Sequence, residues 1–264
     1  FDQLELRLVE LTTNPLDPPS KQLQPITELY IQGQFQQALS HTTEMLERFP
    51  SSAFLHNISG ASNAGLMQFD AAISSYKQAL RINPSYVEVY NNMGIALNDQ
   101  GKPEDAIGSY KQALQIQPNF AEVHNGMGIA LNNVGEPKAA IDSYQVALRI
   151  KPDYAEAHSN LGAILVDLGR LEEAEVSYRQ AIELSPDSAE VYNNLGVMLH
   201  ALGRNKDAEA VYTKALAVKP GYDEALYNLG LLLFEISQYE KAAVQFKLSN
   251  FEKSKYFLLR CLYI

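Results

Sequence analysis

Small, apolar and aromatic residues recur along this chain with a period longer than a single helix. Prolines recur every 34 residues, and a glycine, an alanine and an aromatic residue each recur with the same period. The four rows are Pro50, Pro84, Pro118, Pro152, Pro186 and Pro220; Gly60, Gly94, Gly128, Gly162, Gly196 and Gly230; Ala72, Ala106, Ala140, Ala174, Ala208 and Ala242; and Tyr76, Tyr110, Tyr144, Tyr178, Tyr212 and Phe246. A fixed period of this length is typical of a solenoid, because one unit cannot bury its apolar stripe alone.

Each landmark suits one place in a helix–turn–helix unit, numbered so that the proline is position 32 and Val87 is position 1. Glycine at position 8 lets two helices approach closely, and Gly101 at position 15 suits the left-handed residue that ends a helix. Proline at position 32 ends the second helix. The next residue, as in Ser85 with Glu88 and Asp187 with Glu190, predicts a capping box.

This pattern resembles the tetratricopeptide repeat (TPR), a helix–turn–helix unit of about 34 residues. The resemblance extends over residues 19–250 and implies an all-α, right-handed superhelical solenoid in which the first helix of each unit lines the concave surface. We expect about seven units, the first and last degenerate, at 19–52, 53–86, 87–120, 121–154, 155–188, 189–222 and 223–250. Residues 1–18 form an N-terminal segment with a turn-rich linker, and residues 1–11 could form a short helix. Residues 251–264 are either a capping helix or the start of a following domain.

The first helix of each unit carries two different faces. Positions 4, 7, 8 and 11 share an apolar side, whereas positions 2, 6, 9 and 13 lie opposite and would face the groove. Asparagine recurs at position 6 in four units and is interrupted only by Gly126. The candidate groove residues are Asn92, Ile95, Asp99, Asn125, Ile129, Asn133, Asn160, Asp167, Asn194, Val197, Asn228 and Glu235.

The charge of the first helices limits which classes of partner can bind to them. Segments 87–100, 121–134, 155–168, 189–202 and 223–236 contain nine acidic residues and no Lys or Arg, and the chain has a net charge of −10. This argues against nucleic acid as the main partner, because phosphate binding requires a basic face. It also excludes the mode in which some TPR modules clamp a carboxylate, which requires cationic partners. A protein or peptide that is basic, or that is read through its backbone, fits this surface.

The groove asparagines have two interpretations. An amide offers both a donor and an acceptor, which matches an extended peptide backbone, and the arrangement is similar to the asparagine-lined TPR superhelix of O-linked N-acetylglucosamine transferases. Alternatively, each asparagine is a solvated polar residue or bonds to the neighbouring repeat. The glutamates at position 2 are better explained as capping-box members than as ligands.

No residue pattern indicates an enzyme, a metal site or a cofactor. His124 and His158 occupy position 4, where sister units carry tyrosine, and His41, His56 and His200 stand without a second ligand. Cys261 has no matched histidine, and every recurrent glycine has a structural explanation. A lone cysteine fits a reducing, cytoplasmic location, and no apolar run is long enough to span a membrane.

Three functions follow from these patterns. The first is a protein-interaction scaffold that binds an extended peptide or protein segment in its concave groove. The second is the substrate-recruiting region of a longer enzyme, a glycosyltransferase, sulfotransferase or oxygenase whose catalytic domain follows residue 264. The third is self-association through the ends of the solenoid.

Overall fold

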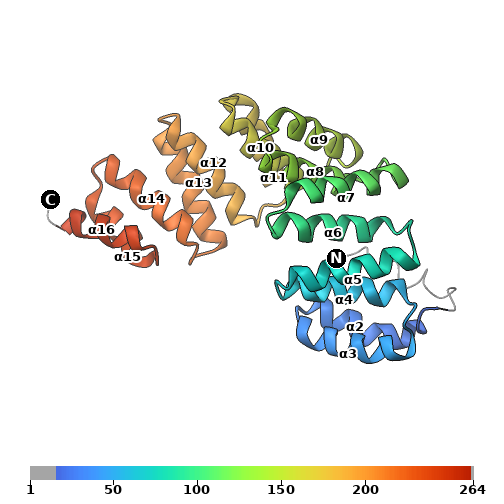
Figure 1. Ribbon diagram of the computed structural model, residues 1–264. Helices are drawn as coiled ribbons and strands as arrows, with labels where there is room; N and C mark the ends of the chain where they lie inside the picture. Colours follow the sequence, from blue (N-terminus) through green and yellow to red (C-terminus); the bar gives the residue numbers. More distant parts are fainter. Residues whose placement is uncertain (1–15, 263–264) are drawn as a thin grey trace. The chain divides into compact units, whose positions relative to one another are not determined.

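The structure is a computed structural model that describes residues 16–262, and these residues form fifteen α-helices and no strand (Figure 1). The short helix expected within residues 1–11 lies outside this range. The helices are α2 (Ser20–Ile31), α3 (Phe35–Arg48), α4 (Ala53–Gly65), α5 (Phe69–Ile82), α6 (Val87–Asp99), α7 (Pro103–Ile116), α8 (Ala121–Asn133), α9 (Pro137–Ile150), α10 (Ala155–Asp167), α11 (Leu171–Leu184), α12 (Ala189–Ala201), α13 (Asn205–Val218), α14 (Asp223–Glu235), α15 (Tyr239–Leu248) and α16 (Glu252–Leu262). Within residues 16–262, none of these helices is long and apolar enough to cross a membrane.

The helices follow the repeat register as antiparallel neighbours. Each repeat holds a first and a second helix that pack together, such as α6 with α7 and α12 with α13. The all-α repeat fold predicted from the sequence is therefore confirmed. The chain divides into two compact units, an N-terminal unit that ends at Ile150 and a C-terminal unit that begins at Lys151.

The glycine at position 8 makes room for an aromatic ring rather than for a bare helix backbone. A Cβ atom on Gly94 would lie 2.5 Å from Cε1 of Tyr110, which is only 1% exposed. The glycines at 60, 128, 162, 196 and 230 meet the ring at position 24 of their own repeat in the same way. The alanines at positions 20 and 27, such as Ala106 and Ala113, are fully buried beside these rings. The glycine and aromatic rows are thus two halves of one contact.

The turn inside each repeat requires a left-handed residue at position 15. Glycine fills this position in five repeats, with φ values such as +80° at Gly101. Met67 and Ser237 occupy the equivalent positions with φ of 59° and 62°. A side chain is strained in this region, because its Cβ approaches the following carbonyl oxygen.

The predicted capping boxes are wrong by one residue. The N-cap of α6 is Tyr86 rather than Ser85, and that of α12 is Ser188 rather than Asp187. Ser85 instead donates its hydroxyl to Asn83, and Asp187 accepts the hydroxyl of Ser185. The residue at position 34 still extends the loop, so the helix begins after it. Ser85 and Asp187 are therefore loop residues and not the capping partners of the glutamates at position 2.

The two ends of the described chain pack on the repeats next to them. Asp17 accepts a hydrogen bond from the Ser52 hydroxyl, which connects the segment before α2 to the first repeats. At the other end α16, red in Figure 1, packs against α15. Its Phe257 ring lies 5.4 Å from the Phe246 ring, centroid to centroid, and 5.6 Å from the Phe234 ring.

Candidate functional site

In each of the two units the candidate groove residues, apart from Asn125 at position 5, lie on one face of the first helices. In the N-terminal unit α4, α6 and α8 lie side by side, and in the C-terminal unit α10, α12 and α14 do so. We call positions 2, 6, 9 and 13 of these helices the first-helix face. Ile95 is 46% exposed and Val197 43% exposed, although both are aliphatic. Of the other candidates, Asp99, Asn133, Asp167 and Glu235 are exposed, Asn92, Ile129, Asn160, Asn194 and Asn228 are half-buried, and only Asn125 is buried.

Several of the candidate asparagines bond to the neighbouring repeat. The Asn92 amide Nδ2 donates to Oδ1 of Asn57 over 3.1 Å, and Asn228 donates in the same way to Asn193 over 2.9 Å. Each bond joins position 6 of one repeat to position 5 of the repeat before it, 35 residues away. Asn133 repeats the arrangement near the other end of the helix, where its Nδ2 donates to Oδ1 of Asn98 over 2.9 Å. For these three residues the second interpretation, a bond between repeats, holds.

Asn194 differs from these residues. Position 5 of the repeat before it is Ser159, and the Asn194 amide has no hydrogen-bond partner among residues 16–262. It is half-buried and stands one helical turn before the exposed Val197. Its donor and acceptor are therefore available to another molecule.

Gly126 breaks the row of amides for a steric reason. A Cβ at this position would lie 2.7 Å from the hydroxyl oxygen of Tyr110. Because glycine cannot donate from a side chain, the Asn91 Oδ1 of the preceding repeat is buried without a hydrogen-bond partner in the described chain. The interruption is thus a consequence of packing.

Acidic side chains lie on the same face of the first helices as the exposed aliphatic residues. In the N-terminal unit Asp99 is exposed as a residue, but partial burial of its carboxyl group raises the carboxyl pKa. In the C-terminal unit, burial raises the pKa of Tyr178 to about 12, and the nearby charges of Asp167 and Glu190 add to this effect. Burial also raises the pKa of Tyr222, with a further contribution from Glu224 and Glu190. The first-helix face of the C-terminal unit therefore carries a negative field.

The histidines at position 4 have a backbone partner that the sequence did not reveal. Nε2 of His124 lies 2.9 Å from the carbonyl oxygen of Pro118, and His158 makes the equivalent contact with Pro152 over 3.0 Å. His56, expected to be isolated, lies 3.1 Å from the Pro50 carbonyl oxygen. These rings satisfy carbonyl groups just beyond the end of the preceding helix.

His200 also has a partner that the sequence did not indicate. Its Nε2 lies 2.9 Å from Oε2 of Glu235 in the next repeat. The pair joins positions 12 and 13, as Asn98 and Asn133 do, and is also 35 residues apart. A search for polar pairs at a spacing of one repeat plus one residue would have found all of these contacts between repeats.

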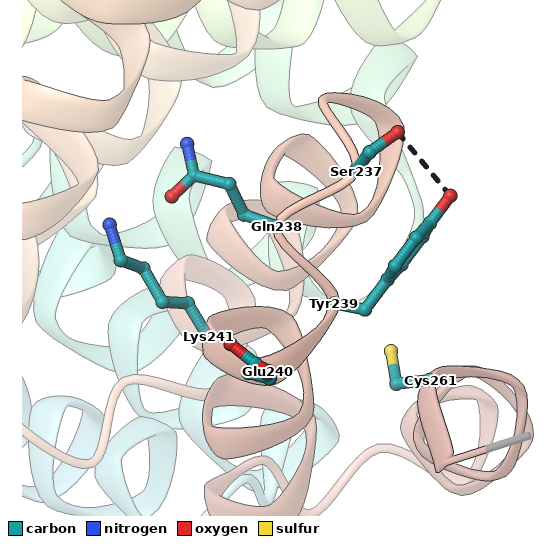
Figure 2. Close-up of a pocket in the computed structure, with 6 residues that line it drawn as sticks. All are labelled: Ser237, Gln238, Tyr239, Glu240, Lys241 and Cys261. Carbon is teal, nitrogen blue, oxygen red and sulfur yellow. Dashed lines mark hydrogen bonds between the residues drawn. The ribbon is translucent and has the colours of Figure 1, made fainter. Parts of the chain in front are cut away.

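A separate cavity of about 620 Å³ lies beside the turn between α14 and α15. Figure 2 shows its lining residues, which are Ser237, Gln238, Tyr239, Glu240, Lys241 and Cys261. The Tyr239 hydroxyl donates to the Ser237 hydroxyl over 3.3 Å, and burial raises the pKa of the Cys261 thiol. Within residues 16–262 no group of three or more His, Cys, Asp or Glu side chains is placed to hold a metal ion.

Comparison with known families and curated proteins gives one match. The family described as the C-terminal domain of cilia and flagella-associated protein 70, a TPR domain, matches residues 29–255. No curated protein matches the chain in sequence. The family match covers more than half of the chain.

Solved structures resemble this chain over different fractions of its length. MamA is 30% identical, with a TM-score of 0.54 over 61% of this chain and 94% of MamA. A chain of the Cut9–Hcn1 hetero-tetramer of the APC/C is 15% identical, with a TM-score of 0.78 over 99% of this chain and 54% of that one. YrrB, described as a TPR protein with an unusual peptide-binding site, is 22% identical, with a TM-score of 0.52 over 70% of this chain and 95% of YrrB. The last two similarities show the fold alone, and together the comparisons support a protein-interaction scaffold.

Proposed function

Because the chain belongs to the family of TPR domains whose model matches residues 29–255, we propose that it is an interaction scaffold that binds an extended peptide or protein segment on its first-helix face. The observation that carries this proposal is the exposure of aliphatic side chains on a face that the fold does not cover. Ile95 and Val197 are almost half exposed and lie at the same position of different repeats. A contiguous apolar patch rimmed by polar residues is typical of a protein-binding surface. The half-buried Ile129 and Leu231 lie at the same position on the first helices next to those of Ile95 and Val197, and extend the aliphatic surface within each unit.

The side chains around these aliphatic residues suit a bound peptide that carries both apolar and basic side chains. Asp99 lies at position 13 of α6, one helical turn beyond Ile95. Asp167 lies at position 13 of α10, the first helix next to α12, which carries Val197. A Lys or Arg of the guest would pair with these carboxylates while an apolar side chain covers Ile95 or Val197. We assign backbone reading to Asn194, because the amides of Asn92, Asn133 and Asn228 are partly used between repeats.

The proposal is tested with peptides selected for binding by display on the purified chain. The tightest peptide is labelled, and its dissociation constant is measured by fluorescence anisotropy. We expect the double variant Ile95→Arg/Val197→Arg to bind at least about tenfold more weakly, as when a central interface contact is lost. Val176→Arg is the matched control, because Val176 is 63% exposed but lies on the second helix α11.

A pair of asparagine variants separates binding from folding. Asn194→Ala should weaken peptide binding and leave the unfolding midpoint unchanged. Asn228→Ala should lower the midpoint instead, because the buried Asn193 then loses the donor that its Oδ1 accepts from. Equal affinity of the wild-type chain and of the Ile95→Arg/Val197→Arg variant, both fully helical by circular dichroism, would contradict the proposed binding face.

A further inference from the structure

The last helix carries an apolar face that nothing in the described chain covers. Ser254, Phe257, Leu258 and Cys261 are the buried or half-buried residues of α16, which packs on α15. On the opposite side of α16, Tyr256 is 59% exposed and Leu259 is 55% exposed. These two residues are three positions apart and therefore share one side of the helix.

Cations flank this apolar side. Lys255 lies along one edge, and Lys253 and Arg260 lie along the other at the angular spacing of an α-helix. Arg260 also lies over the Tyr256 ring, with its Cζ atom 5.7 Å from the ring centroid. Glu252 is the only acidic residue of α16, so this helix is basic within an acidic chain. A partner for it should present aliphatic side chains between acids.

The first-helix face of the C-terminal unit has this composition. Val197 is exposed on α12, and Leu231 is half-buried at the same position of α14. Glu190 and Glu224 lie near the starts of these helices, and Asp167 lies at the end of α10. The lengths are also similar, because α16 has 11 residues and a first helix spans 12 residues from position 2 to position 13.

Two other arrangements fit less well. Two copies of α16 facing each other would bring Lys255 and Arg260 of both molecules together, and like charges across an interface are unfavourable. Stacking of α16 on α2 would cover mostly polar residues. The exposed side chains of α2 are Lys21, Gln22, Gln24, Pro25, Glu28 and Ile31.

We propose that α16 of one molecule docks, through Tyr256 and Leu259, on the first-helix face around Val197 of a second copy. This inference rests on the proposed function, because it places a segment of the same chain on the proposed guest site. The contact joins two different surfaces, so in a pair one molecule keeps its first-helix face free and the other keeps its α16 free. Contacts of this kind build open chains or rings rather than closed pairs.

Sedimentation of the full chain over a wide range of concentrations tests the proposal. We expect the average mass to rise beyond that of a dimer, and to fall at high salt because the flanking charges are screened. Leu259→Glu should weaken the association at least about tenfold. Val176→Glu is the matched control, because it introduces the same charge at an exposed aliphatic residue of α11 and should leave the association unchanged.

Charge reversal identifies the two surfaces. Lys255→Glu and Glu190→Lys should each weaken the association, and mixing the two variants should restore it. A chain that stays monomeric at every concentration overturns the proposal. So does association that Glu190→Lys leaves unchanged. If such a chain still binds the display-selected peptide, the proposed function stands and only the self-association fails.

Discussion

Replacing Ser62 with alanine should stabilise the protein, although the residue is completely buried. Ser62 lies in α4 at position 10 of its repeat and is 0% exposed. Its hydroxyl oxygen has no hydrogen-bond partner among the described residues. The equivalent residues of the next two repeats are Ala96 and Ala130, also buried, so a methyl side chain fits this position.

Two contributions should stabilise the Ser62→Ala variant, and one should oppose them. A buried polar group without a partner costs about 1 to 3 kcal/mol, because it loses its hydrogen bonds to water. Serine is also a weaker helix former than alanine, by less than about 0.7 kcal/mol. The loss of packing around the deleted oxygen opposes both contributions. We therefore expect the free energy of unfolding to rise by about 1 to 2 kcal/mol.

Urea unfolding followed by far-UV circular dichroism measures this change. The midpoint should rise while the slope of the transition stays constant. Ser109→Ala is the control, because Ser109 is also a buried helical serine but donates to the Asp105 carbonyl oxygen over 3.2 Å. Both variants gain the same helix propensity, so their difference isolates the unpaired hydroxyl. A midpoint for Ser62→Ala at or below that of Ser109→Ala would refute the reasoning.

Three further predictions test other parts of the structure. Gly94→Ala should lower the free energy of unfolding by about 1 to 3 kcal/mol, because its Cβ collides with the buried Tyr110 ring. Gly108→Ala, with open space around its Cβ, should raise the free energy of unfolding by about 1 kcal/mol in the same urea titration, and equal effects of the two changes would contradict the collision. Met67→Gly should raise the thermal midpoint by relieving a left-handed methionine, and a lower midpoint would contradict the assigned strain. Cys261 should react with a thiol reagent with a pH midpoint above the value of about 8.5 for a free cysteine, because burial raises its pKa and disfavours the thiolate. The same chain in urea should show a lower midpoint, and equal midpoints would contradict the burial.

The positions of the helices were predictable from the sequence, but the N-cap residues and the groups that the glycines contact were not. A recurring proline and glycine at fixed spacing place each helix, so α6 begins at Val87, which the repeat numbering makes position 1. The N-cap is Tyr86 rather than Ser85, because the backbone N–H and the hydroxyl of Ser85 both donate to Oδ1 of Asn83 in the preceding loop. The role of Gly94 was predicted in kind, but the group it accommodates, the ring of Tyr110, emerged only from the packing.

The exposure of the proposed binding face was predictable for the face as a whole but not residue by residue. Helical periodicity placed Ile95 and Val197 away from the core, and both are exposed. The same periodicity could not distinguish Asn228, which bonds to Asn193, from Asn194, which has no partner in the described chain. That distinction depends on which residue the preceding repeat presents, and so on contacts between helices rather than within one.

The hydrogen bonds that join asparagines of successive repeats have a consequence for how arrays of this kind change in length. A whole repeat can be duplicated or excised without shifting the register, so position 6 of one repeat again faces position 5 of the repeat before it across the new junction. The bond also has a direction, since the later repeat donates and the earlier one accepts. An added repeat therefore continues these hydrogen bonds at both of its ends only when it carries an acceptor at position 5 and a donor at position 6, a condition that the repeat with Gly126 does not meet. Gene duplication in whole repeats preserves this condition automatically, whereas a single-residue insertion between two repeats would uncouple every amide pair that spans it.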